Sequence, residues 1–344
     1  MDKNEIISGY NFSNTCNVIF SRYVSYEEYE NLDHSKIIVL QKTNDYIFYR
    51  LKSFELSEND SIFCNNFSIA SLFHLLKDQN DFKNIKIVSS QTDLTVTKKI
   101  FETKPTCVSK WFSVNVEHKS DNLIAIPLGI GNNFQKKYVN PELLENANEN
   151  FNFESEPTLY LNFRENTNEK HRKYITESFI NESWVFHSEP NLSIDNYIKD
   201  ISSNSFVLAP WGNGIDTHRI WESLYLGSIP VVKYHHSLNT LKDLPVLFVN
   251  DYKEINLELL NKTQERFKTQ DFNLEKLNLD WWLKNKININ NESSMHQSVT
   301  IKSNYFNNSL FRFQFILDRK FESYKKKISY YFKRLISLIR NKDL

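Results

Sequence analysis

Hydrophobic runs recur along the first 130 residues, separated by polar turns and by stretches of helical periodicity. Short runs rich in Ile, Val, Phe and Leu predict buried strands at 36–40, 46–51, 61–64, 85–89, 108–114 and 123–127. Apolar positions at helical spacing predict helices at 68–77 and 95–102. Strands that alternate with helices are typical of a mostly parallel, doubly wound α/β sheet.

A second alternating set follows a polar stretch at 135–156, which predicts a linker. Its hydrophobic pattern predicts strands at 158–163, 184–187, 205–209, 229–233 and 246–249, and helices at 169–180, 193–202 and 217–226. The chain is therefore predicted to form two α/β units facing one another across a cleft, over 1–145 and 156–300. We expect ligands at the carboxyl ends of their strands.

The last segment, 301–344, is predicted to form a crossover helix and a basic amphipathic tail. At 319–342, Lys and Arg lie opposite apolar positions at helical spacing, which are Phe321, Tyr324, Ile328, Tyr331, Phe332, Leu335 and Leu338. Such a helix fits a membrane-surface anchor. The alternative is a helix packed across the N-terminal unit.

Composition narrows the class of protein. The 344 residues carry 42 basic and 42 acidic side chains, so no global field attracts nucleic acid, and any charged site must be local. Three cysteines without a CxxC spacing indicate neither a disulfide framework nor a zinc site. No signal peptide and no apolar run of about 18 residues is found. We expect a cytoplasmic protein, peripheral at the inner face of the membrane if the tail binds there.

Glycine use points to the chemistry. Five of the six glycines fall in two places, at 129–131 and 212–227. In the second place a predicted strand runs into Pro-Trp-Gly-Asn-Gly-Ile-Asp, and a helix opens near Thr217. The glycines permit positive φ and close backbone approach, and Asp216 or Thr217 is expected to cap the helix. A helix N-terminus is a natural seat for a diphosphate.

Charged residues in the first turns of this helix support an anion site. Arg219 lies where the helix dipole disfavours a cation unless an anion is bound. His218 is placed to donate to the same anion, and Glu222, one turn later, to reach a ribose hydroxyl pair. The alternative is a structural βαβ turn with a capped helix and a surface Arg–Glu pair, because a Gly-x-Gly turn alone is weak evidence.

The whole word from 205 to 232, SFVLAPWGNGIDTHRIWESLYLGSIPVV, resembles the donor domain of the exostosin-like glycosyltransferases, including bacterial and viral members. Upstream pieces look similar to the same family, namely SSQTD, SKWFSVN, IPLGIGN and LNFRENTNEKHR. The resemblance implies a GT-B fold of two Rossmann-like domains, with the nucleotide-sugar, expected to be a UDP-sugar, on the second domain. It also implies an inverting transfer without a metal or other cofactor, and no DxD motif precedes a helix.

Site residues follow from the resemblance and from position. Arg219 would neutralise the leaving diphosphate, and Glu222 would hold the ribose. The phosphates or the sugar would be lined by Gly212, Asn213, Gly214 and Asp216. Further nucleotide contacts are expected at the strand–loop–helix junction that holds Asn162, Thr167 and Arg172, although Arg172 could instead pair with a carboxylate. Acceptor-side loops are expected at Asn115, Gly129, Gly131 and Asn132.

An inverting transfer needs one general base at a strand end of the first unit. Asp93 follows the predicted strand at 85–89 and is the first choice, with helix capping as the alternative. Glu117 and His118, past the strand at 108–114, are the other candidates. His235 and His236 could touch the base or ribose, and without a third ligand at suitable spacing they predict no metal site.

We therefore expect a glycosyltransferase (hexosyl or pentosyl) that extends a glycan or lipid-linked glycan of a bacterial surface polysaccharide, such as lipopolysaccharide or capsule. Two rival functions are a non-catalytic carbohydrate-binding or scaffold subunit of the same fold, and a sugar- or polyol-phosphate transferase or glycan phosphorylase.

Overall fold

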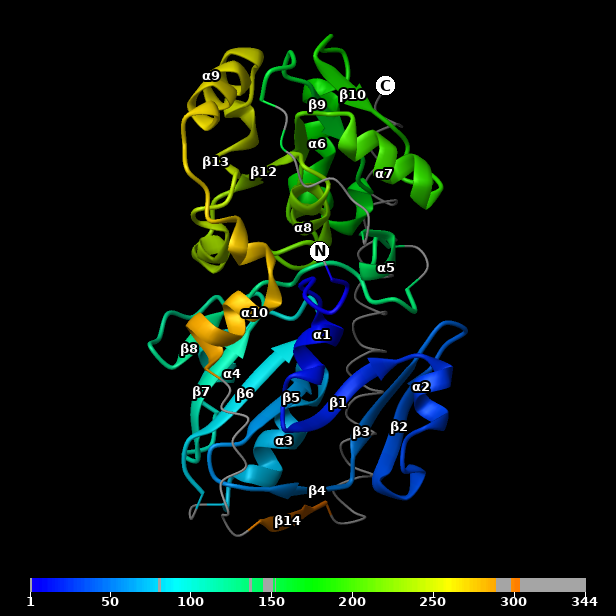
Figure 1. Cartoon of the computed structure of the whole chain (residues 1–344), viewed down its shortest axis with the longest axis vertical. Coiled ribbons are helices and arrows are strands. Elements are labelled where there is room, and N and C mark those ends of the chain that lie inside the picture. Colours follow the sequence, from blue (N-terminus) through cyan, green and yellow to red (C-terminus); the bar gives the residue numbers. More distant parts are fainter. Residues whose placement is uncertain are drawn as a thin grey trace, which may run out of the picture.

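The structure, a computed structural model, describes residues 2–79, 82–135, 138–144, 151, 153–288 and 298–303. Two β-sheets occupy the lower and upper halves of Figure 1, with the N-terminus between them. The predicted amphipathic tail and part of the predicted linker lie outside the described residues. Within the described part of the chain, no helix is long and apolar enough to cross a membrane.

The first sheet has seven strands in the order β2-β3-β1-β5-β6-β7-β8. Their bounds are β1 Val18–Val24, β2 Ile37–Lys42, β3 Ile47–Leu51, β5 Ser61–Asn65, β6 Ile85–Ser90, β7 Val108–Ser113 and β8 Leu123–Ala125. Strands β1, β5, β6, β7 and β8 run parallel, whereas β3 is antiparallel to both β1 and β2. The β5 sequence SIFCN is buried at every position, because a central parallel strand is covered on both faces.

The second sheet is parallel throughout, in the order β10-β9-β11-β12-β13. Its strands are β9 Leu159–Leu161, β10 Val185–His187, β11 Phe206–Leu208, β12 Ile229–Lys233 and β13 Leu247–Val249. The chain passes from β9 to β10 on one side and then returns to β11 on the other. The strand order therefore reverses between β9 and β11, which is where doubly wound sheets bind ligands.

Helices connect the strands of both sheets. They are α1 Gly9–Asn14, α2 Tyr26–Glu30, α3 Ile69–Leu76, α4 Lys98–Phe101, α5 Pro141–Leu144, α6 Glu169–Phe179, α7 Ile194–Ser202, α8 His218–Tyr225, α9 Leu257–Lys268 and α10 Leu279–Trp282. The predicted strands and helices of the second unit each have a counterpart within a few residues. The mixed α/β architecture with parallel sheets is confirmed and is consistent with Rossmann-like folds.

After α9 the chain returns to the first sheet. The bridge of Ile6 with Asn278 joins the segment before α10 to the N-terminal residues, and β14 (Val299–Lys302) pairs antiparallel with β4 (Ser53–Leu56), at the bottom of Figure 1. The Leu279 backbone N–H donates to Glu5 O at 2.7 Å. The buried Tyr225 hydroxyl accepts from Ile7 N at 2.8 Å and donates to Leu277 O at 2.6 Å. These contacts place α10 and β14 against the first unit, although both lie within or at the end of the range predicted for the second.

Several elements of the first unit differ from the sequence-based expectation: β4, α1, α2 and α5 were not predicted, and β1 and α4 show the physical reasons. The central strand β1 was not predicted, because Ser21 and Arg22 interrupt its apolar pattern. Both side chains are buried, and Nη1 of Arg22 donates to Ser13 Oγ at 2.8 Å. The helix predicted at 95–102 is wrong in extent, because Val96 forms a β-bridge with Val116 and Thr97 caps the single turn of α4.

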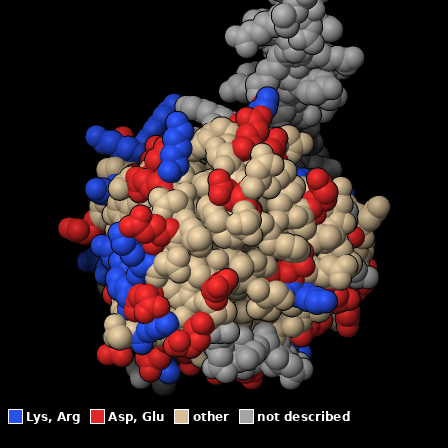
Figure 2. Space-filling model, turned by 90° about the horizontal axis from the view of Figure 1, so that it is seen from above, with Lys and Arg blue, Asp and Glu red and all other residues tan. Residues whose placement is uncertain are grey.

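On the end of the molecule shown in Figure 2, uncharged residues cover most of the face, acidic side chains are scattered over it, and basic side chains gather mainly on its left side. The chain as a whole has equal numbers of basic and acidic residues. A site for an anion on this protein therefore depends on locally placed cations, which come from the loop after β9 and from the helices α6 and α8.

Candidate functional site

The loops that follow β9 and β11 meet at the point where the strand order reverses. Arg172, on α6, holds both loops in place. Its guanidinium donates to Trp211 O at 2.9 Å, Pro210 O at 2.8 Å and Arg164 O at 3.1 Å. Burial, and secondly the charge of Arg219, lower the pKa of Arg172 to about 10. The predicted alternative, a pairing of Arg172 with a carboxylate, is not found among the described residues, where backbone carbonyls take its hydrogen bonds.

Asn115, at the carboxyl end of β7, ties this loop to the first sheet. Its Oδ1 accepts from the backbone N–H groups of Ile215 and Asp216, each at 2.9 Å. Asn115 itself has a positive φ of 53°. A Cβ on Gly214 would lie 2.7 Å from Asn115 Nδ2, so glycine is needed there for space. Gly212 and Gly214 do not use the positive φ that glycine permits; positive-φ glycines among the described residues are Gly129 and Gly227.

Asp216, the next buried residue of this loop, also links the loop to the first unit. Its Oδ2 accepts from Leu128 N and its Oδ1 from Trp221 Nε1, both at 2.9 Å. The carboxyl is therefore engaged by protein donors from both units. Asp216 does not cap α8 through its side chain, and Thr217 is the N-cap residue without a side-chain hydrogen bond. Burial raises the pKa of Asp216 to about 6.

This raised pKa predicts a pH-dependent stability. Because folded Asp216 holds its proton more tightly than the unfolded chain, its contribution increases as pH falls from about 6 to about 4. A shift of two units corresponds to up to about 3 kcal/mol. The free energy of unfolding of the wild type, minus that of Asp216→Asn measured by denaturant titration, should rise over this range. A difference that stays constant between pH 4 and 7 would contradict the expectation.

The N-terminus of α8 presents groups without internal partners. Thr217 Oγ1 and Arg219 Nε are buried atoms without a hydrogen-bond partner in the described structure. The Arg219 guanidinium lies 5.8 Å from the centroid of the Tyr197 ring, and none of the described carboxylates pairs with it. The predicted surface pair of Arg219 with Glu222 is therefore not formed among the residues that the structure describes. Arg164, Arg172 and Arg219 together supply local positive charge at the switch point.

Glu222 lies one turn beyond His218 and is 3% exposed. Its Oε2 accepts from the Tyr197 hydroxyl at 2.7 Å. Burial keeps the pKa of Tyr197 well above its ordinary value, against the lowering effect of the Arg219 charge and with a further rise from Glu222, so Tyr197 remains a donor to Glu222. Tyr197, on α7, was not identified from the sequence, because no motif links it to α8. Its helical spacing within α7 indicates only a partly buried position.

Asp93 approaches this loop from the first sheet. The Asn213 side-chain amide donates to Asp93 Oδ2 at 3.3 Å, and both residues are exposed. The alternative role of Asp93 as a helix cap is wrong, because Thr97 caps α4. Glu117 is exposed. Burial and then the charge of His236 lower the pKa of His235, and the charge of Glu117 opposes this shift. His118 instead packs on Phe101, with ring centroids 5.3 Å apart.

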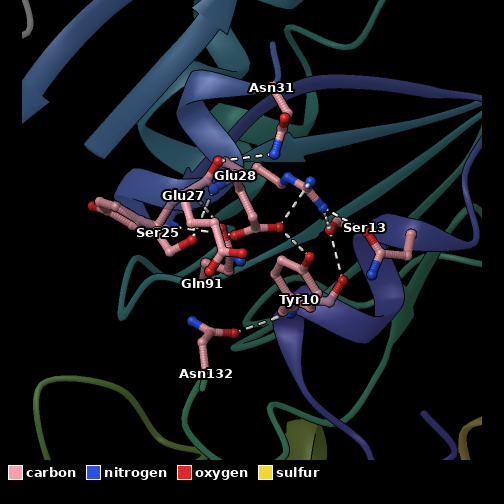
Figure 3. Close-up of polar contacts among 11 residues, drawn as sticks. Tyr10, Ser13, Ser25, Glu27, Glu28, Asn31, Gln91 and Asn132 are labelled. Carbon is pink, nitrogen blue, oxygen red and sulfur yellow. Dashed lines mark hydrogen bonds and ion pairs between the residues drawn. The ribbon is translucent and has the colours of Figure 1, made fainter. Parts of the chain in front are cut away.

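The loop after β8 lies beside the first turn of α8. His218 Nδ1–H donates to Gly129 O at 2.7 Å, which leaves Nε2 as its second polar atom. A Cβ on Gly129, whose φ is +71°, would lie 2.0 Å from Ile7 O. Asn132 Oδ1 accepts from Tyr10 N at 3.1 Å, within the polar network drawn in Figure 3. Gly131 and Asn132 thus shape a loop that packs against α1.

The remaining predicted residues lie around the second sheet. Asn162 Nδ2 donates to Ser188 Oγ and Glu189 O, so it joins the ends of β9 and β10. The Thr167 methyl would be 3.8 Å from a Cβ on Gly212. His235 packs edge-on against Trp211 at 5.6 Å. Across the described ranges, no group of three His, Cys, Asp or Glu residues is arranged to hold a metal ion.

Residues 155–299 match the family model described as the RXYLT1 C-terminal domain. No curated protein matches the chain. The matched range contains the whole second sheet, the loop that begins at Pro210 and the helix α8. The match supports a glycosyltransferase family related to xylosyltransferases, and it covers the part of the chain in which the arginines converge.

Proposed function

We propose that this protein transfers a sugar from a nucleotide-sugar, of which a UDP-sugar is the first choice, to a hydroxyl of a growing glycan. The observation that carries the proposal is Arg219, in the first turn of α8 at the strand-order reversal, with no carboxylate partner in the described chain. A cation at a helix N-terminus is unfavourable unless an anion is bound. A leaving diphosphate is such an anion, and Arg164 and Arg172 add to the local positive charge.

The proposed donor site is built by the second sheet. The diphosphate lies against the α8 N-terminus and Arg219, with Thr217 Oγ1 as a further donor. Glu222, oriented by Tyr197, accepts from ribose hydroxyls. Asn213 lies beside the sugar, and Gly212 keeps the loop close to Arg172, because a Cβ there would lie 3.2 Å from Arg172 Nη2. Asp216 and Asn115 act as positioning residues for this loop.

The proposed reaction is a single inverting displacement. The acceptor oxygen attacks the anomeric carbon, the bond from that carbon to the diphosphate oxygen breaks, and the acceptor proton passes to the base. Asp93 is the proposed base, because it is exposed and contacts the donor-side loop through Asn213. Arg219 and the helix dipole stabilise the departing diphosphate, so the proposed transfer needs no metal ion. Glu117 and His118 remain the other candidates for the base.

The proposal includes a two-domain GT-B arrangement with the acceptor on the first unit and the donor on the second. Contacts such as that of Asn115 with Ile215 support this placement of the two substrates, because they bring loops of the two sheets together. A lipid-linked or surface glycan of bacterial type is the proposed acceptor. The membrane-binding role of the tail at 319–342 stays a prediction from the sequence.

Nucleotide binding gives the direct test. UDP should raise the melting temperature of the full chain, with a stabilisation of about 2.7 kcal/mol at 100 times the dissociation constant. Uridine, which lacks the phosphates, is the matched control and should stabilise far less, because Arg219 and α8 bind the diphosphate. If UDP, GDP and CMP all leave the melting temperature unchanged at millimolar concentration, the proposed function is wrong.

A further inference from the structure

Three aromatic side chains lie on the first-sheet side of the proposed site, and we call Tyr46, Phe134 and Tyr138 the aromatic platform. Tyr46 comes from the turn between β2 and β3, and the other two from the loop after β8. The rings of Tyr46 and Phe134 lie 6.2 Å apart. Tyr138 is 47% exposed, and the other two rings are partly buried. Exposed or partly exposed aromatic rings near a candidate site are more typical of ligand binding than of core packing.

Tyr138 is close to the groups proposed for the reaction. Its ring centroid is 5.8 Å from that of His218, the first residue of α8. Burial raises the pKa of Tyr138, the charges of Asp93 and Glu222 raise it further, and Arg164 lowers it. Tyr138 therefore lies within electrostatic range of Asp93, the proposed base on the first unit, and of Glu222 and Arg164 on the second unit.

Hydrogen bonds fix the loop that carries two of the platform rings. Asn132 accepts from Tyr10 N, and the Asn132 backbone N–H donates to Gln135 Oε1 at 3.0 Å. The Tyr10 hydroxyl donates to Glu28, which also pairs with Arg22 at 3.6 Å (Figure 3). A Cβ on Gly131 would lie 2.6 Å from Tyr138 Cβ, so glycine lets this ring sit against its own loop. A platform held in this way needs little ordering when a ligand binds.

We propose that the aromatic platform stacks against a pyranose ring of the glycan acceptor and so presents the acceptor hydroxyl to Asp93. A pyranose has an apolar face of C–H groups edged by hydroxyls, which fits aromatic rings beside the carboxylate of Asp93 and the amide of Asn213. This inference rests on the proposed function. The acceptor is favoured over the donor sugar, because the platform belongs to the first sheet, whereas the arginines for the diphosphate belong to the second.

The test compares ring-removing and ring-keeping variants of the full chain. Wild-type protein is first applied to a panel of immobilised neutral oligosaccharides, and the oligosaccharide with the strongest signal is then titrated. Tyr138→Ala and Phe134→Ala should each lower its affinity about tenfold or more. Tyr138→Phe should stay within about twofold, because the ring is kept. The matched control is Phe186→Ala, which removes a ring of 46% exposure on β10.

Binding of UDP separates the possible outcomes. All four variants should keep the UDP-induced rise in melting temperature. If Tyr138→Ala binds the oligosaccharide as the wild type does, or weakens only a UDP-sugar, the platform does not hold the acceptor. Wild-type protein that binds UDP and no oligosaccharide of the panel would also overturn the inference. A different outcome is also possible: the wild type binds an oligosaccharide but no nucleotide, and Tyr138→Ala loses the oligosaccharide. In that case the proposed transferase function is wrong, and the platform remains a glycan-binding surface.

Discussion

Replacing Arg219 with alanine should lower the turnover of sugar transfer by about 10²–10³-fold. Arg219 is the side chain proposed to neutralise the diphosphate as the bond to the anomeric carbon breaks. Its guanidinium packs over Tyr197 without a carboxylate among the described ion pairs, so its charge is free to act on a ligand. Steady-state rates of nucleotide release from a UDP-sugar, with and without acceptor, measure the effect.

Two further variants make this result specific. Arg219→Lys should recover part of the turnover, because the charge is kept and the planar fork is lost. Arg266→Ala removes an arginine of α9 that lies over the Phe267 ring, and it should behave as the wild type. Should Arg219→Ala retain more than about a third of the wild-type rate, the diphosphate must be stabilised elsewhere.

Replacing Asp93 with asparagine should lower transfer by about 10²–10⁴-fold while UDP binding stays within twofold of the wild type. Asparagine keeps an oxygen that can accept from Asn213, so the contact between the loops is retained and only the proton-accepting group is removed. The measurement is transfer to an acceptor at saturating donor, together with the UDP-induced rise in melting temperature.

The control for Asp93 is Asp121→Asn, an exposed aspartate that follows β7 and should leave both readouts unchanged. Glu117→Gln and His118→Asn test the two other candidate bases. A fully active Asp93→Asn combined with an inactive Glu117→Gln would move the base to the end of β7, next to His235.

Periodicity predicted the parallel strands well and failed at polar positions inside the core. The strand at 229–233 was predicted with the bounds that the structure has, because IPVVK is apolar through its buried length. Strand β1 was not predicted, because it contains the charged residue Arg22, which is buried although a charged residue is expected at the surface. Its partners Ser13 and Asn14 come from α1, and no pattern within β1 itself shows that they are there. Burial of a charged side chain depends on neighbours that are distant in the chain.

The motif from Pro210 to Glu222 was recognised from sequence, but the role of each residue was decided by contacts. Asp216 was predicted to line the donor, which stays a prediction, and the structure shows that its carboxyl accepts from Leu128 and Trp221. Arg172 was expected at the nucleotide, which also stays a prediction, and the structure shows that its hydrogen bonds go to loop carbonyls. Tyr197 and the aromatic platform were not identified from the sequence. Their contacts join residues that are distant along the chain, and no pattern of neighbouring residues predicts such contacts.

The sequence by itself determined the motif from 205 to 232, in which a buried strand runs through a glycine-containing turn into a helix with Arg219 in its first turn. These features depend on residues that are neighbours along the chain, so periodicity and helix electrostatics are enough to read them. Only the tertiary structure decided that Asn115 holds this turn from the other sheet, and that Asp93 and Tyr138 lie beside it. Such contacts join residues about 100 positions apart, and packing of the whole chain, rather than local propensity, sets which of them meet.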